Sequence, residues 1–264
     1  MKTIRTVDEL RAELRGRESV GLVPTMGAFH EGHLALIRAA RAENETVVVS
    51  LFVNPAQFDE SADLAAYPRD EARDLALAES EGVDVVFAPS ADEMYPPGFQ
   101  TWVEVEDVAR GLEGDARAGH FRGVATVCLK LFVAAAPQRA YFGQKDAQQA
   151  AVVRRLVRDL ALPLEIRVVP TVREPDGLAL SSRNVLLSPA DRGRALALPA
   201  ALAAGADAYA GGGDPVAATR AALNGLTPDY VELFDLDGTL VLASAVRVGS
   251  TRLIDNVILK GDLG

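Results

Sequence analysis

Short apolar segments that alternate with stretches of helical periodicity constrain the fold of this chain more than any other feature of its sequence. Residues 46–53 are rich in β-branched side chains and apolar on both faces, as expected for a strand inside a covered parallel sheet. Strands alternating with helices favour an α/β fold, a doubly wound, Rossmann-like parallel sheet. We expect its strands at residues 19–25, 46–53, 83–87, 139–142 and 164–169, with helices between them at about 71–81, 124–135 and 148–160.

The composition changes near Thr171, which suggests a second domain. Turn-forming residues occupy 173–177, and the chain beyond them is alanine-rich, which predicts a helix over 189–209 because alanine has the highest helix propensity. A glycine run at 211–213 precedes a second predicted helix at 215–223 and two predicted strands at 230–236 and 252–259. We therefore predict two domains, residues 1–171 and a smaller C-terminal α+β domain of residues 172–264.

The charge balance and the single cysteine exclude several classes of protein. Asp and Glu number 37 against 27 Lys and Arg, a net charge of −10 that disfavours broad binding to nucleic acid or anionic membranes. Cys128 has no partner for an intramolecular disulfide, and its place beside an apolar helical stripe predicts a buried thiol. No apolar run reaches the roughly 18–20 residues of a membrane span, and residues 1–5 do not resemble a signal peptide. We expect a cytoplasmic protein.

Histidine placement gives the first functional signal, because two of the three histidines, His30 and His33, lie three residues apart where the first predicted strand leads into a helix. This spacing puts both rings on one side of the opening turn, where free N–H groups and the helix dipole attract phosphate. Gly27 and Gly32 leave room for close approach of a ligand. The alternatives are two solvated or capping histidines, or a zinc site that includes His120. Zinc needs further ligands and no cysteine cluster exists, so we predict no metal site.

Eight sequence blocks together resemble the pantoate–β-alanine ligase family of the nucleotidylyltransferase superfamily, which carries an HxGH signature. They lie in order along most of the chain: residues 24–33, 52–58, 67–69, 119–123, 142–146, 148–149, 176–184 and 252–256.

The resemblance implies a two-step reaction on small molecules. ATP and pantoate give pantoyl adenylate and pyrophosphate, and the amine of β-alanine then displaces AMP to form the amide. The implied partners are therefore ATP, pantoate and β-alanine, with Mg²⁺ accompanying ATP, no nucleic acid and no membrane, in a homodimer. Residues 1–171 would bind nucleotide and pantoate, and residues 172–264 would act as a lid.

The resemblance also assigns site residues. His33 would be the proton donor at the phosphates, assisted by His30 and Lys145. Asn54 would shape the pantoate loop, and His120 and Arg122 are weaker candidates for the acyl or amine end. The residues implied to bind ATP are Met26, Gly27, Ala28, Phe29, His30, Glu31, Gly32, His33, Gly143, Gln144, Lys145, Asp146, Val172, Leu180, Ser181, Ser182 and Arg183; those implied to bind pantoate or β-alanine are Gln57 and Gln149.

Three positions depart from the family pattern: Gln144 replaces a glutamate, Ala147 an aromatic residue and Ala56 a methionine. A neutral glutamine at position 144 argues against any role at that position that needs negative charge. Two alternative functions follow: nucleotidyl transfer to another acceptor, or ATP sensing without turnover. Residues 234–240 also resemble a phosphatase nucleophile motif, but too few residues follow for that fold, so we interpret Asp237 and Gly238 as a turn.

Overall fold

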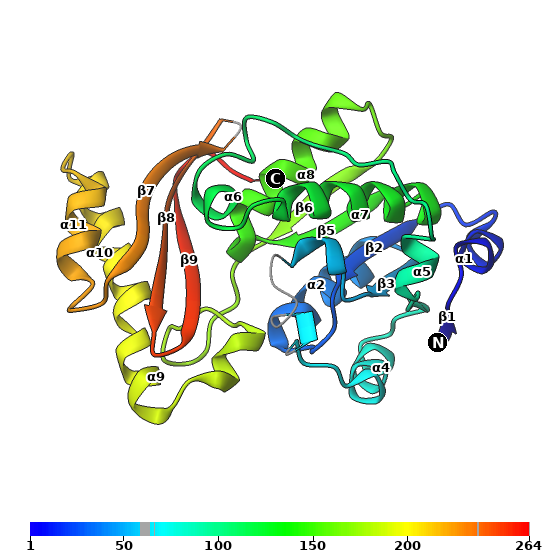
Figure 1. The fold of residues 1–264 in the computed structure, drawn as a ribbon, viewed down its shortest axis with the longest axis horizontal. Helices are drawn as coiled ribbons and strands as arrows, with labels where there is room; N and C mark the ends of the chain where they lie inside the picture. The colour runs from blue at the N-terminus through cyan, green and yellow to red at the C-terminus, as the bar shows by residue number, and fades with distance from the viewer. Residues whose placement is uncertain (59–63, 66, 237, 264) are drawn as a thin grey trace. The chain divides into compact units, whose positions relative to one another are not determined.

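The computed structural model describes residues 1–58, 64–65, 67–236 and 238–263. These residues form two compact units (elements labelled in Figure 1): unit 1 contains residues 1–143 and 148–169, and unit 2 contains residues 144–147 and 170–263. The division falls two residues before the predicted boundary at 171/172. That residues 172–264 act as a separate lid domain stays a prediction.

In the described part of unit 1, six strands form a parallel sheet in the order β1-β4-β3-β2-β5-β6. Along the chain, β3 and β4 are added on one side of β2, and β5 and β6 are then added on its other side. This order confirms the doubly wound parallel sheet. The edge strand β1 was not predicted. The strands are β1 (Lys2–Ile4), β2 (Val20–Thr25), β3 (Thr46–Leu51), β4 (Val85–Phe87), β5 (Arg139–Gly143) and β6 (Glu165–Val169).

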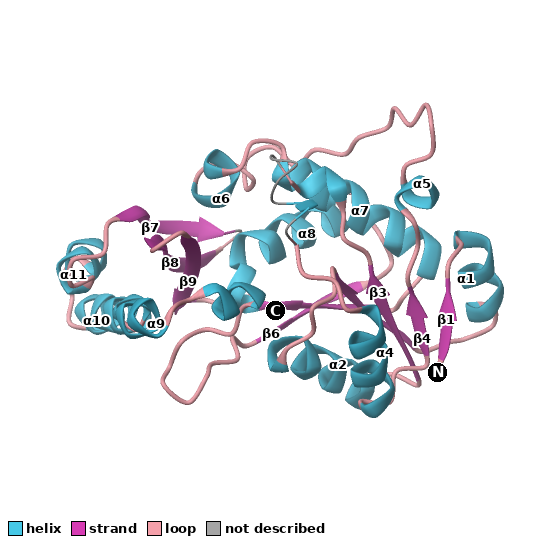
Figure 2. Ribbon diagram, turned by 60° about the horizontal axis from the view of Figure 1, so that its bottom comes forward, coloured by secondary structure: helices cyan, strands magenta, loops and turns pink. Residues whose placement is uncertain are grey.

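Helices cover both faces of this sheet (Figure 2). Successive strand residues alternate between two apolar clusters, so Leu22 and Val48 pack with α7 and α8 while Val23 and Val49 pack with α2 and α4. This double burial explains the uniformly apolar strands. The helices of unit 1 are α1 (Val7–Leu14), α2 (Glu31–Glu43), η1 (Pro55–Gln57), α4 (Glu71–Ser80), α5 (Ala91–Met94), α6 (Leu112–Ala116), α7 (His120–Ala135) and α8 (Ala147–Asp159, beginning in unit 2).

Cys128 lies on α7 within the apolar cluster, as predicted. Its thiol is buried, and burial raises its pKa to about 12. A thiol in such surroundings stays protonated and is a poor nucleophile. Cys128 therefore belongs to the core.

Unit 2 contains an antiparallel sheet in the order β7-β8-β9 among its described residues. Its apolar cluster lies between this sheet and α10. The strands are β7 (Pro228–Leu236), β8 (Thr239–Val248) and β9 (Thr251–Lys260), and the helices are η2 (Gln144–Asp146), η3 (Ser182–Leu186), α9 (Pro189–Ala195), α10 (Ala197–Ala210) and α11 (Pro215–Ala222).

Two predictions for this unit were wrong in detail. The single helix expected over 189–209 is two helices, α9 and α10, because Pro199 has no N–H to donate and its ring would meet the carbonyl of Ala195. The central strand β8 was missed: like β3 it is buried along nearly its whole length, but Ala243, Ser244 and Ala245 interrupt its run of β-branched and large apolar side chains. The phosphatase-like segment joins β7 to β8 in an antiparallel hairpin, and the predicted turn residue Asp237 lies outside the described residues.

No helix among the described residues is long and apolar enough to span a bilayer.

Candidate active site

The loop that links β2 to α2 carries the histidine pair and is shaped by Gly27. The hydroxyl of Thr25 donates to the carbonyl of Ser50 (2.6 Å) and accepts from the amide of Gly27 (3.3 Å). Gly27 has φ +88°, and a Cβ there would lie 2.7 Å from Leu51 Cδ1. Both the left-handed backbone and the lack of space require glycine at this position.

Asp74, which the sequence analysis did not single out, holds this loop from α4. It is 2% exposed, and its two carboxylate oxygens accept from the amides of Ala28 and Phe29, each at 2.8 Å. The neighbouring Arg73 donates through Nη1 to the carbonyl of Phe29 (3.1 Å). A helix distant in sequence thus fixes the backbone just before the histidines. The signal available in the sequence was an acidic residue on the otherwise core-facing row of a helix.

The two histidines cap α2 and fix each other's hydrogen bonding. His30 is the N-cap, and its Nδ1 accepts from the amide of Gly32 (3.1 Å), while its own amide donates to His33 Nδ1 (3.4 Å). The ring centroids lie 4.2 Å apart. Because Nδ1 is the acceptor in both rings, each neutral imidazole carries its proton on Nε2. The capping interpretation and the phosphate interpretation are compatible, since capping uses Nδ1 while the ring proton lies on Nε2.

The remaining side chains of the 26–33 segment differ in their exposure. Met26 and Ala28 are partly exposed, like the two histidines. Phe29 is buried in the apolar cluster with α2 and α4, so its side chain contributes packing. Glu31 is exposed and forms an ion pair with Arg38. A direct ligand contact in this segment therefore falls to the imidazoles more readily than to the side chains of Phe29 and Glu31.

Gln57 lies in a buried polar network after β3. Asn54 Nδ2 donates to Gln57 Oε1 (2.8 Å) and to the carbonyl of Gly123 (3.1 Å). The hydroxyl of Tyr95 donates to Asn54 Oδ1 (2.9 Å), and burial raises its pKa to about 12, so it stays protonated. A Cβ on Gly123 would lie 2.1 Å from the carbonyl of Ala56, so the close approach of α7 to η1 requires glycine.

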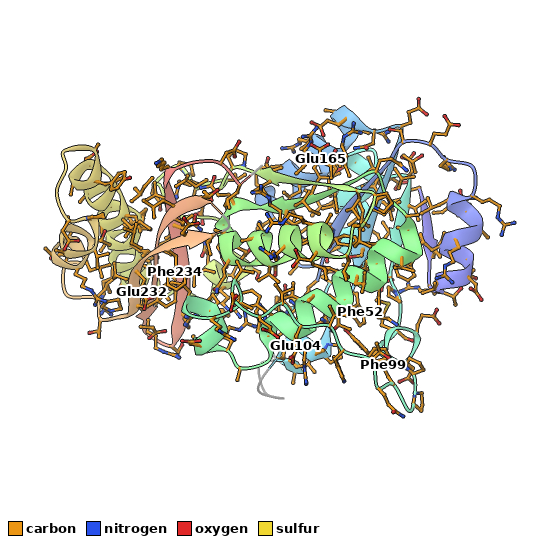
Figure 3. The ribbon with its side chains drawn as sticks, turned by 90° about the horizontal axis from the view of Figure 1, so that it is seen from above. Phe52, Phe99, Glu104, Glu165, Glu232 and Phe234 are labelled. Atoms are coloured by element: carbon orange, nitrogen blue, oxygen red, sulfur yellow. The ribbon has the colours of Figure 1, made fainter. Side chains whose placement is uncertain are left out.

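His120 contacts the backbone of Gln57. The Gln57 carbonyl accepts from Arg117 Nη2 (3.0 Å) and lies 3.1 Å from His120 Nδ1. A carbonyl can only accept, so His120 carries a proton on Nδ1, and its Nε2 lies 3.3 Å from Arg117 Nη1. His120 therefore supports the Gln57 loop. Arg122 is instead on the surface, over the ring of Trp102 (4.9 Å). The Trp102 ring packs against Tyr95 and Phe99, and Phe99 is labelled in Figure 3.

The adjacent glutamines of α8 have different environments. Gln148 is buried; its Nε2 donates to the carbonyls of Val108, Arg110 and Gly111, and its Oε1 accepts from the amide of Glu113 (3.0 Å). Its hydrogen-bonding capacity is thus committed to the segment before α6. Gln149 is partly exposed, which leaves it as the glutamine of the pair suited to a ligand.

In unit 2, the turn η2 carries Lys145 and is held by β9. Asn256 Nδ2 donates to the carbonyls of Gln144 (3.0 Å) and Lys145 (2.9 Å). The Lys145 ammonium lies 3.8 Å from the carboxylate of Asp146. Gln144 Nε2 is 3.5 Å from Asn256 Oδ1, so this departure from the family pattern keeps a polar contact without negative charge. Gly143, at the end of β5, belongs to unit 1.

The remaining residues implied to bind ATP lie in or just after a short hairpin of unit 2. The amide of Leu180 donates to the carbonyl of Val172 (3.0 Å). Ser181 caps η3 by accepting from the amide of Arg183 (3.3 Å), as a capping serine should. Ser182 is partly exposed and Arg183 is exposed. No three side chains of His, Cys, Asp or Glu gather as metal ligands among the described residues.

A doubly wound α/β sheet with an imidazole-capped helix N-terminus after a central strand is typical of enzymes that act on phosphate-bearing substrates. The sequence model of the pantoate-beta-alanine ligase family matches residues 1–258, and the chain belongs to this family. It is a ligase, and the reaction of the family joins pantoate to β-alanine.

Relatives and solved structures agree with this assignment. A protein named pantothenate synthetase from Roseiflexus castenholzii is 55% identical over 98% of this chain and 100% of its own. The crystal structure of pantothenate synthetase from Thermus thermophilus is 49% identical, with a TM-score of 0.94 over 99% of this chain and 100% of that one. A pantoate-beta-alanine ligase from Francisella tularensis, complexed with beta-gamma ATP and beta-alanine, is 33% identical with a TM-score of 0.85 over the whole of both chains. These matches support neither alternative function.

Proposed function

We propose that the chain condenses pantoate with β-alanine through a pantoyl-adenylate intermediate. A pantoate carboxylate oxygen attacks the α-phosphorus of ATP, and the bond from that phosphorus to the bridging oxygen breaks, releasing pyrophosphate. The amine nitrogen of β-alanine then attacks the acyl carbon and loses a proton, and AMP leaves as the carbon–oxygen bond breaks. The observation that carries this proposal is the histidine pair His30 and His33 at the N-terminus of α2, with Nδ1 of each ring accepting from a backbone amide.

Each set of residues has a role in this proposal. His33 and His30 donate to phosphoryl oxygens, and Lys145 adds a compact cation at the phosphates. Asp146 contacts the ribose. The other residues proposed to bind ATP are Met26, Gly27, Ala28, Phe29, Glu31, Gly32, Gly143, Gln144, Val172, Leu180, Ser181, Ser182 and Arg183. Of these, Phe29 and Gly27 would act indirectly, by shaping the segment, since the Phe29 ring is buried, the Phe29 amide is held by Asp74, and Gly27 has no room for a side chain.

Gln57 and Gln149 hold pantoate in this proposal. A neutral amide both donates and accepts without adding charge beside the reacting carboxylate. The buried network through Asn54, Tyr95 and His120 supports such a role for Gln57, because it fixes both the backbone and the side-chain oxygen of that residue.

We further propose a cytoplasmic homodimer that uses ATP with Mg²⁺. Mg²⁺ prefers oxygen ligands and commonly binds substrate phosphates together with a few carboxylates. The described side chains do not assemble a metal cluster of their own, so they give no basis for a protein-held ion.

The stoichiometry of products tests the proposed route. Incubation with ATP, Mg²⁺, pantoate and β-alanine should release one AMP and one pyrophosphate for each amide formed. With pantoate and no β-alanine, labelled pyrophosphate should exchange into ATP, because the first step is reversible. ADP and phosphate as products, or exchange that needs an acid other than pantoate, would contradict the proposal.

The adjacent glutamines of α8 give a paired prediction about pantoate binding. Gln149→Ala should raise the KM for pantoate about tenfold or more and leave the unfolding midpoint nearly unchanged, since a partly exposed side chain is lost. Gln148→Ala should instead lower the free energy of unfolding by about 1–3 kcal/mol, because buried carbonyls and an amide lose their partner. Steady-state kinetics and thermal unfolding of both variants measure this. The reverse pattern would show that the roles of the two residues are exchanged.

A further inference from the structure

Two successive residues of β9, Asp255 and Asn256, each hold a different segment of unit 2. Both are buried, at 2% and 4% exposure. Successive residues on a strand point to opposite faces, so each side chain reaches its own segment. Asn256 reaches the η2 turn and Asp255 reaches the hairpin that precedes η3.

Asn256 fixes the backbone on which Lys145 stands. Its Nδ2 donates to two successive carbonyls, those of Gln144 and Lys145, at 3.0 and 2.9 Å. The side-chain amide of Asn256 thereby fixes the short 3₁₀ turn η2, from which the Lys145 side chain extends. Lys145 itself is largely covered, with 19% of its side chain exposed, so the direction of its backbone limits where its ammonium group can be placed.

Asp255 fixes the hairpin that leads to Arg183. It forms a two-point ion pair with Arg173, with Nη1 to Oδ2 at 2.7 Å and Nη2 to Oδ1 at 3.0 Å. Arg173 Nη1 also donates to the carbonyl of Gly177, which closes the hairpin (3.1 Å). Two parallel bonds between a guanidinium and a carboxylate restrain orientation as well as distance.

The hairpin then passes this restraint on to η3. Glu174, next to Arg173, accepts from Asn184 Nδ2 at 2.8 Å, and Asn184 directly follows Arg183. Glu174 also pairs with both terminal nitrogens of Arg192 on α9, and these hydrogen bonds hold its pKa below the usual range. A connected set of bonds thus runs from β9 to the residue beside Arg183.

We propose that Asp255 and Asn256 are positioning residues for the phosphates of ATP, Asn256 acting through Lys145 and Asp255 acting through Arg183. The proposal rests on the proposed function, in which these two cations bind ATP. Through these two residues, strand β9 fixes the backbone at Lys145 and beside Arg183. The distance between these two backbone positions within unit 2 therefore does not depend on the lysine and arginine side chains themselves.

Asn256 is tested by its donor chemistry. Asn256→Ala and the equally sized Asn256→Asp both remove the two donated bonds, so both should raise the KM for ATP about ten- to a hundredfold. The KM values for pantoate and β-alanine should change by less than about twofold. If the alanine variant does not fold, the aspartate variant decides. An aspartate variant with a normal KM for ATP would overturn the role of Asn256.

Thr219→Val is the matched control. It also removes a buried side-chain bond to a carbonyl in unit 2, from Thr219 to Pro215 (2.8 Å), but on α11. It should lower the unfolding midpoint comparably and leave the KM for ATP within about twofold of the original. An equal rise in that KM would show that general loosening of unit 2 explains the Asn256 result.

Double-mutant cycles separate positioning from stability. In the Lys145→Ala background, Asn256→Ala should raise the KM for ATP by less than about a further twofold. In the Arg183→Ala background, Asp255→Asn should likewise raise it by less than about a further twofold. In the crossed pairs the free-energy effects of the two changes on the KM for ATP should add. These pairs are Asn256→Ala with Arg183→Ala and Asp255→Asn with Lys145→Ala. Additivity in the first two cycles, or normal ATP kinetics in Lys145→Ala or Arg183→Ala, overturns this inference. Failure of the unmodified protein to form AMP from pantoate would overturn the proposed function instead.

Discussion

Replacing His33 with alanine should lower kcat for adenylate formation by about 10²–10³, the usual cost of losing one preorganised donor to a developing phosphoryl charge. The His33 ring is partly exposed, and the bond that its Nδ1 accepts from the His30 amide is long, at 3.4 Å. The variant should therefore fold with an almost unchanged unfolding midpoint. Pyrophosphate exchange with pantoate measures the step, and circular dichroism checks the fold.

Two further variants separate hydrogen bonding from proton transfer at this position. Gln places its amide nitrogen near the position of imidazole Nε2, whereas Asn places it near Nδ1. If donation from Nε2–H is what matters, His33→Gln should retain more exchange activity than His33→Asn. Equal loss in both would indicate that His33 must release a proton. A normal rate in His33→Ala would remove His33 from the mechanism.

The fold was predictable from the sequence where burial repeats along the chain. The strand at 46–53 is β-branched and apolar on both faces, the helix at 148–160 has a periodic apolar pattern, and both were found within two residues of the expected bounds. The central strand β8 was not predicted, because alanine and serine in its middle interrupt the kind of β-branched run that revealed β3. The break between α9 and α10 follows from Pro199, which lies inside an alanine-rich stretch. The prediction of a single helix relied on the alanine content and gave too little weight to this proline.

The residues of the candidate site also differ in whether a local sequence pattern reveals them. Residues that carry chemistry in contiguous motifs, such as His30 and His33, are visible in the sequence. The contacts by which distant residues support them are not visible, even though Asn256 lies in the block 252–256, because Asp74 follows Phe29 by 45 residues and Asn256 follows Lys145 by 111. Neither has a spacing rule, since their contacts depend on how helices and strands pack. Whether the motif residues bind the proposed ligands stays a prediction.

Replacing Asp74 tests whether such support matters for catalysis. Asp74→Ala leaves the buried amide of Phe29 and the partly buried amide of Ala28 without an acceptor, so the free energy of unfolding should fall by about 2–5 kcal/mol. Asp74→Asn keeps one acceptor oxygen but turns an NH₂ group toward a backbone amide. We expect it to fold and to lower kcat about ten- to a hundredfold, because the loop before the histidines shifts. The KM for pantoate should change little.

Asp70→Ala supplies the control from the same helix. Asp70 caps α4 by accepting from the amide of Arg73 (3.1 Å), and its loss should cost about 1 kcal/mol of stability. If destabilising α4 were enough to impair the enzyme, this variant would lose kcat as Asp74→Asn does. If instead the carboxylate acts by fixing the amides of Ala28 and Phe29, Asp70→Ala keeps its kcat. In that case Asp74→Asn should also lose protection of those two amides against hydrogen exchange, while protection of the β2 and β3 amides persists.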